Sequence, residues 1–270
     1  MLIIGELINT TRKPVREAVE KRDEQYIREI AKAQEKAGAD YIDVNCGTFV
    51  GTEAPTMEWL VETLLKETKL PLCIDSANPL ALEAGLKKAI HGQSMINSIT
   101  DEASRWNAVL PLAKKYGTKI IALCIEDAGM PKTANSRVRI SASLITKLRA
   151  AGVAMEDIYI DPVIVPISTG ESHGVDVLDA VQEIMKAYSR VHTVCGLSNI
   201  SFGLPARHML NRTFIVQAIA RGMDSYILDP TDKEMQRALL ASQALVGHDK
   251  FCRKFITAYR QGFFGRLQGE

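Results

Sequence analysis

The chain has 270 residues, of which 46% are hydrophobic and 24% charged, and its formal net charge is +1. This length allows one or two domains with a full-sized core, and the balanced charge provides no broad basic field for nucleic acid. No apolar run approaches the roughly 18 to 20 residues of a membrane span. The apolar N-terminus also lacks the basic lead and the cleavage site of a signal peptide.

The cysteines are scattered, odd in number and without a CxxC spacing: Cys46, Cys73, Cys124, Cys195 and Cys252. Such a pattern is not that of a disulfide framework or of a structural zinc site. We therefore expect a protein of the reducing cytoplasm, without a membrane or nucleic-acid partner.

Short apolar runs rich in Ile, Val, Leu and Cys alternate with amphipathic segments along the whole chain. Runs of this length are typical of parallel strands that are covered on both faces. The expected strands are residues 2–9, 41–47, 71–76, 94–99, 119–125, 157–164, 193–200 and 225–230. Helices are expected over residues 23–37, 101–116 and 135–151, each followed by a glycine, and the second of them has an acidic residue as its expected cap.

Eight strand–helix units over most of the chain predict an α/β protein with a single domain, residues 1–270, folded as a closed (β/α)8 TIM barrel. The pattern after residue 232 indicates the eighth helix and an extra helix at the C-terminus. No Ser/Gly-rich linker marks a domain boundary. A doubly wound open sheet shows the same alternation and is the alternative.

Polar residues stand on or just after most of the expected strands. In a (β/α)8 barrel the carboxyl ends of all strands meet at one face, where active sites lie. Each residue alone is explained by a turn or a helix cap, because Asp and Asn favour both. The whole set predicts a ligand site, because buried polar groups without partners are costly. Its members are Asn9, Asp43, Asn45, Asp75, Asn97, Asp161, Ser198, Asn199 and Asp229.

The residue types in this set restrict the chemistry. No His, Cys or Lys stands at a strand end beside a catalytic partner, so we expect no metal site of several histidines and no catalytic triad. Paired carboxylates can hold magnesium, and a metal-dependent barrel hydrolase or aldolase is therefore an alternative. A carboxylate accepts two parallel hydrogen bonds from an amidine-like edge, whereas an amide donates one and accepts one. The amino group and the adjacent ring N–H of a pterin form such an edge.

Six stretches carry a family resemblance: LIIGELIN, YIDVNCG, CIDS, MINS, IDPVI and GLSNISFGLP. In this order and spacing they resemble the methyltetrahydrofolate:corrinoid protein methyltransferases and the related folate module of cobalamin-dependent methionine synthase. The resemblance covers essentially the whole chain, and GLSN is its most specific piece. It implies a (β/α)8 barrel that forms a homodimer. It also implies that the protein moves a methyl group between tetrahydrofolate and the cobalt of a corrinoid (cobalamin), which a partner protein carries. The transfer can run in either direction.

The resemblance also assigns roles to strand-end residues. Asp75, Asn97 and Asp161 are implied to hold the pterin, and Asn199 is implied to form a hydrogen bond with the nitrogen that carries the methyl group. Asn199, Asp75 and Asp161 are the expected catalytic residues. No metal ligand is expected among them.

Residues near the seventh strand have further implied roles. Gly196 and Ser198 shape the wall of the folate pocket, and Arg207 lies near the benzoyl-glutamate side of the folate. Phe202, Gly203 and Leu204 depart from the family, because some members carry amides there. We expect Phe202 to pack on an aromatic ring of the folate.

Dihydropteroate synthase, from the same superfamily, is the alternative pterin enzyme. It shares Asp and Asn at the third, fourth and sixth strands, but it is expected to carry a Lys after the seventh strand, Arg-x-His at the eighth and a Ser-rich first loop. This chain has Asn199, LDPTD and NTTRKPV in these places. The departures favour methyl transfer, and a binder without catalytic activity, for folate or for a corrinoid partner, is a further alternative.

Overall fold

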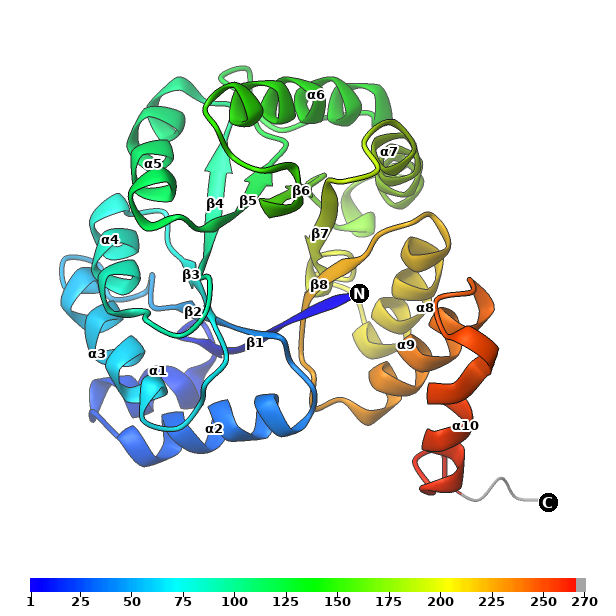
Figure 1. Ribbon diagram of the computed structural model, residues 1–270, viewed down its shortest axis with the longest axis horizontal. Coiled ribbons are helices and arrows are strands. Elements are labelled where there is room, and N and C mark those ends of the chain that lie inside the picture. The colour runs from blue at the N-terminus through cyan, green and yellow to red at the C-terminus, as the bar shows by residue number, and fades with distance from the viewer. Residues whose placement is uncertain (266–270) are drawn as a thin grey trace.

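The computed structural model describes residues 1–265, and in it eight parallel strands form a closed barrel in the order β1 to β8 (Figure 1). Strand β1 pairs with both β2 and β8, so the predicted (β/α)8 TIM barrel is confirmed and the open sheet is excluded. The last five residues of the expected domain, 266–270, lie outside the described part of the chain. The strands are β1 (Leu2–Asn9), β2 (Tyr41–Asn45), β3 (Leu72–Asp75), β4 (Met95–Thr100), β5 (Lys119–Leu123), β6 (Ile158–Asp161), β7 (His192–Gly196) and β8 (Ser225–Leu228).

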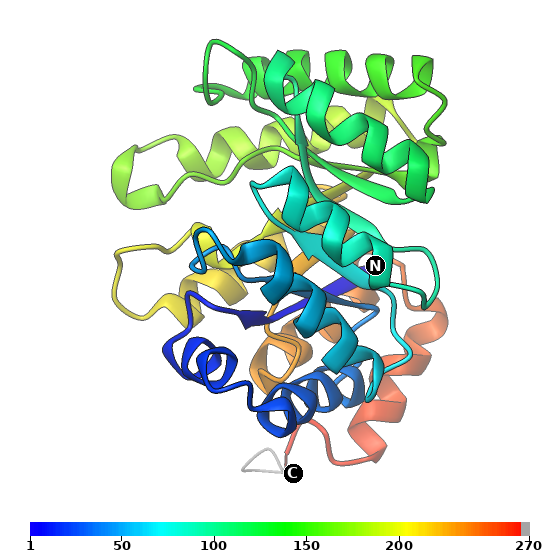
Figure 2. The same cartoon turned by 90° about the vertical axis from the view of Figure 1, so that its left-hand side faces the viewer.

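Helices surround this barrel on the outside (Figure 1). They are α1 (Lys13–Glu20), α2 (Glu24–Lys36), α3 (Glu53–Leu65), α4 (Pro79–Lys88), α5 (Ala103–Tyr116), α6 (Ala134–Ala150), α7 (His173–Ala187), α8 (Arg207–Ala220), α9 (Lys233–Leu245) and α10 (Arg253–Arg260). Figure 2 shows α10 on the outer side of the barrel, where it packs against α9. None of the helices within residues 1–265 is long and apolar enough to cross a bilayer.

Several predicted boundaries were wrong for physical reasons. Strand β6 ends at Asp161 rather than at residue 164, because Pro162 has no N–H and Val163 has a φ of 62°. Strand β7 ends at Gly196 rather than at residue 200, because Leu197–Asn199 form a turn of 3-10 helix. Helix α1, which follows the first loop and contains a proline in its first turn, was not predicted.

The helix ends follow local side-chain chemistry. Asp23 caps α2 by accepting a hydrogen bond from the N–H of Tyr26, and α5 ends at Gly117, which has a φ of 59°. The expected acidic cap of α5 was wrong, since Glu102 forms no capping hydrogen bond. Asp101 instead accepts hydrogen bonds from Ser143 and Lys147.

The core has one apolar layer between strands and helices and another inside the barrel. The inner layer takes one buried side chain from each of β1 to β7: Ile4, Tyr41, Cys73, Met95, Ile121, Tyr159 and Val194. These side chains fill the part of the barrel towards the start of the strands. Polar side chains therefore gather at the opposite end.

Candidate active site

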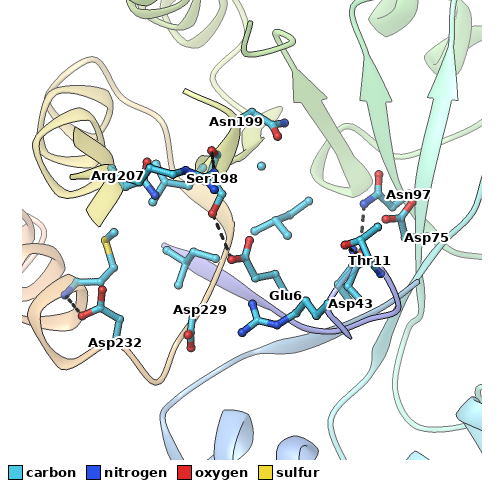
Figure 3. A pocket seen from close by; sticks show the side chains of 18 of the residues that line it. Glu6, Thr11, Asp43, Asp75, Asn97, Ser198, Asn199, Arg207, Asp229 and Asp232 are labelled. Carbon is cyan, nitrogen blue, oxygen red and sulfur yellow. Dashed lines mark hydrogen bonds between the residues drawn. The ribbon is translucent and has the colours of Figure 1, made fainter. Parts of the chain in front are cut away.

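A cavity of about 630 Å³ opens at the carboxyl ends of the strands (Figure 3). This volume is in the range of small-molecule sites. The residues that line it are Glu6, Asn9, Thr11, Arg12, Asp43, Asp75, Asn97, Leu123, Asp161, Gly196, Leu197, Ser198, Asn199, Arg207, His208, Asn211, Ile227, Leu228, Asp229, Asp232 and Met235. The structure thus brings together the predicted site residues except Asn45 and Phe202, neither of which lines the cavity.

One wall pairs carboxylates with amides from neighbouring strands. The Nδ2 atom of Asn45 donates to Oδ2 of Asp75 at 2.8 Å, and Nδ2 of Asn97 donates to Oδ1 of Asp43 at 3.3 Å. Burial raises the pKa of Asp75 to about 6, against the hydrogen bond from Asn45. Burial, together with the nearby charge of Asp75, raises the pKa of Asp43 well above its ordinary value. This wall therefore presents acceptors that are protonated more readily than surface acids.

Asp161 at the end of β6 is the most buried of the three residues that are predicted to bind the pterin. It is 8% exposed, and its Oδ1 accepts a hydrogen bond of 2.7 Å from the N–H of Val163. Burial raises its pKa to about 7, although the N–H of Val163, the charge of Arg137 and the N–H of Gly196 all act in the opposite direction. Asp161 is therefore a carboxyl group that changes protonation near neutral pH.

The end of β7 builds the facing wall, which carries Ser198, Asn199 and Arg207 across the pocket from Asp75 and Asn97 (Figure 3). The Oγ atom of Ser198 donates to Oε1 of Glu6 at 3.2 Å. The guanidinium of Arg207 donates from Nη2 to the carbonyl of Ser198 at 2.7 Å. Hydrogen bonds from Ser198 to β1 and from α8 to Ser198 thus fix the turn after β7 in place.

Phe202 was expected to lie against the folate, but the structure places it outside the residues that line the cavity. Its side chain is 64% exposed, and its ring centre lies 5.9 Å from the Cζ atom of Arg207. The ring therefore lies at the surface beside the pocket, where it contacts the arginine rather than the cavity.

Sequence reasoning missed Glu6, which lies on β1 in the middle of the pocket (Figure 3). Burial raises the pKa of its carboxyl, and the hydrogen bond from Ser198 is the largest opposing effect. A lone charge in the apolar run LIIGELIN was the available signal. Arg12, His208 and Asp232 were also missed, since they lie on loops and helix starts without a pattern that points to them.

The acids do not form a recognisable metal centre. Within residues 1–265, His, Cys, Asp and Glu side chains form no group of three or more placed to hold a metal ion. Asp43 and Asp75 each accept an amide hydrogen bond instead. This pairing suits the recognition of an organic donor edge.

The chain folds as a (β/α)8 barrel with a cavity at the carboxyl ends of its strands, and the sequence comparison identifies its family. The family model described as pterin binding enzyme matches residues 5–229, so the chain belongs to this family. Over its whole length it is 35% identical to the methylcorrinoid:tetrahydrofolate methyltransferase of Eubacterium limosum, and each chain is covered completely. It is also 34% identical to methionine synthase of Mycobacterium tuberculosis, over 84% of this chain and 20% of that protein.

Solved structures of dihydropteroate synthases share the architecture. The enzyme of Xanthomonas albilineans in complex with 7,8-dihydropteroate has a TM-score of 0.69 at 18% identity, and the match covers 90% of this chain and 93% of that one. The Yersinia pestis enzyme has a TM-score of 0.65 at 16% identity, with 91% and 93% covered. These likenesses show the fold alone.

Proposed function

We propose that this protein transfers a methyl group between tetrahydrofolate and the cobalt of a corrinoid that a partner protein carries. The observation that carries the proposal is the placement of Asn199 across one cavity from Asp75 and Asn97 (Figure 3). The full-length likeness to a methylcorrinoid:tetrahydrofolate methyltransferase supports it.

The acid–amide wall is the proposed pterin site. Asp161 and Asp75 accept hydrogen bonds from the amino group and ring N–H of the pterin, and Asn97 both donates and accepts. Asn97 already donates to Asp43, which fixes the orientation of its amide. The N–H donors of a bound pterin favour the charged form of Asp161. Its pKa of about 7 in the ligand-free protein lets it lose its proton when the pterin binds.

The proposed chemical step concerns the folate nitrogen that carries the methyl group. As the carbon–cobalt bond forms, the carbon–nitrogen bond breaks, and the nitrogen keeps the electron pair and takes up a proton. The reverse reaction retraces this path. An amide at Asn199 can accept from a protonated nitrogen or donate to an unprotonated one, so it can follow both states. Water supplies the proton, and Asp75 and Asp161 are the proposed carboxylates that complete its path.

The remaining wall residues shape the site. Gly196 leaves room for the amide of Asn199, and Ser198 ties the turn after β7 to Glu6. Arg207 offers a cation to the benzoyl-glutamate part of the folate, and Phe202 stands beside it at the surface. The cavity is open, which suits a reaction with a bulky corrinoid held by another protein.

The proposal includes a homodimer in the cytoplasm. All the cysteines are free thiols, which suits a reducing compartment. Apolar side chains near the end of the chain are exposed, including Leu245 at 84% and Phe251 at 75%, and they offer surface for a second copy. Light scattering on the purified protein tests the dimer.

A turnover assay tests the function directly. The protein is mixed with methyltetrahydrofolate and Co(I)-cobalamin, and with methylcobalamin and tetrahydrofolate, while the cobalamin spectrum is followed. We expect methyl transfer in both directions. Folate binding without transfer in either direction would identify a binder that lacks catalytic activity. Condensation of a pterin pyrophosphate with 4-aminobenzoate would identify a dihydropteroate synthase, but no lysine lines the cavity among the described residues.

A further inference from the structure

Arg137 on α6 is a completely buried cation behind the pocket. Its side chain is 0% exposed, and its hydrogen bonds go to backbone carbonyls: Nε donates to Pro162 at 2.9 Å and Nη2 to Val163 at 3.2 Å. Its Nη1 atom has no hydrogen-bond partner among the described residues. Burial of a charge in this way is costly, so the arrangement needs a compensating role.

The two carbonyls belong to the turn that follows Asp161. Val163 has a φ of 62°, a left-handed conformation that β-branched residues rarely adopt. In this conformation its N–H donates to Oδ1 of Asp161 at 2.7 Å. The peptide unit between Pro162 and Val163 is therefore held at its oxygen by Arg137 and gives its N–H to Asp161. Hydrogen bonds linked in this way polarise and strengthen one another.

The charges around Asp161 single out the same arginine. The buried thiols of Cys124 and Cys195 interact electrostatically with Asp161, and burial raises the pKa of both, so they stay neutral. Arg137 itself also interacts with Asp176 of α7 and with Cys124. Arg137 is thus the cation whose charge counters the effect of burial on the pKa of Asp161.

We propose that Arg137 is a positioning residue, which fixes the carboxylate of Asp161 towards the pocket through the Pro162–Val163 peptide. Its effect on pterin binding rests on the proposed function. Its link to Asp161 does not, because the contacts lie within the ligand-free protein.

The test uses Arg137→Gln, Arg137→Lys and the matched control Arg139→Gln, whose residue lies on the same helix, is exposed and pairs with Glu126. The carboxyl of Asp161 is titrated by 13C NMR in the ligand-free protein, with Asp161→Asn for assignment. Loss of the charge in Arg137→Gln should raise the titration midpoint by about one pH unit, whereas Arg137→Lys and the control should stay within about 0.3. A folded Gln variant with the wild-type midpoint would overturn the proposal.

Exchange of the Val163 amide hydrogen separates geometry from charge. Both Arg137 variants should exchange at least about threefold faster than wild type, because neither Gln nor Lys has the rigid planar fork with which the guanidinium holds both carbonyls. If the Gln variant does not fold, the Lys variant decides, and an unchanged exchange rate contradicts the proposal. Calorimetry with folate at pH 8.5 should show binding weakened at least about threefold in Arg137→Gln. If Arg137→Gln shifts the titration midpoint of Asp161 but the wild-type protein binds no folate, the proposed function is rejected. The link between Arg137 and Asp161 is then still supported.

Discussion

The Nδ2 atom of Asn199 lies only 3.2 Å from the position that a Cβ atom would occupy on Gly196. This separation is tighter than almost all real contacts of a Cβ atom, so any side chain at position 196 must displace the amide. The end of β7 therefore carries no side chain where the amide of Asn199 needs the space. Displacement by a few tenths of an ångström is enough to disturb a hydrogen bond to a reacting atom.

Gly196→Ala should lower the rate of methyl transfer about tenfold, because the new methyl group pushes the amide of Asn199 from its place. Single-turnover kinetics measures the rate. Gly174→Ala is the control, since its Cβ would meet Ile167 at an ordinary distance of 3.4 Å. Equal rates in the two variants would show that the position of the amide is not critical.

Asp161→Asn should stabilise the ligand-free protein at pH 8. Burial raises the pKa of Asp161 to about 7 in the folded state, whereas an unfolded Asp titrates near about 3.9. Between these values the folded protein holds a proton that the unfolded chain releases, so the contribution of Asp161 to stability falls as the pH rises from about 4 to about 7.

The asparagine variant lacks this penalty and keeps an acceptor for the N–H of Val163. Its free energy of unfolding should exceed that of wild type by about 1–3 kcal/mol at pH 8, and by almost nothing below pH 4. Urea unfolding at both pH values measures the difference. A gain of the same size at both pH values would contradict the assigned protonation.

Asp161→Ala should weaken folate binding by about 1–3 kcal/mol, because the donors of the pterin lose their buried acceptor. Asp75→Ala should act in the same way. Calorimetry at pH 8 measures both, with Asp179→Ala as a control, since Asp179 lies outside the cavity and pairs with Arg221. An unchanged affinity in folded Asp161→Ala would remove Asp161 from the site.

Methyl transfer should survive complete chelation. The carboxylates of Asp43 and Asp75 are paired with amides, and no ligand group of three acids, histidines or cysteines exists within residues 1–265. The assay is repeated after dialysis against a chelator. Activity that is lost and then restored by a single divalent ion would support the metal-dependent alternative instead.

The sequence predicted the barrel well because its signals are local. Each strand is a short apolar run, and polar residues such as Asp75 and Asp161 stand where strands end. Hence the ring of strand-end residues could be recognised before the structure.

Contacts between distant segments could not be predicted in this way. Ser198 meets Glu6 across 192 residues of sequence, and only closure of the barrel brings them together. The left-handed turn at Val163 has no sequence signal, since valine is an unfavourable residue there. Phe202 was placed from its neighbours in the chain, but loop geometry turned it towards solvent.

Asn199→Ala should affect mainly the chemical step. The role of Asn199 in the loop depends on its carbonyl, which accepts a hydrogen bond from the N–H of Phe202 at 3.1 Å, and alanine keeps that carbonyl. The side-chain amide is what the variant loses. If this amide stabilises the changing charge at the folate nitrogen, single-turnover methyl transfer should fall by about ten- to a thousandfold. Folate affinity should change much less, because the pterin edge is held by other residues.

Rapid mixing of the enzyme, saturated with methyltetrahydrofolate, with Co(I)-cobalamin measures this rate. Asn107→Ala on the exposed face of α5 is the control for removal of an amide far from the cavity. If Asn199 merely begins the loop after β7, its alanine variant should keep its turnover, because the backbone carbonyl that holds the loop remains. A single-turnover rate within about twofold of wild type would therefore rule out the catalytic assignment, whereas a slow step with nearly normal folate affinity would place the amide at the reacting nitrogen.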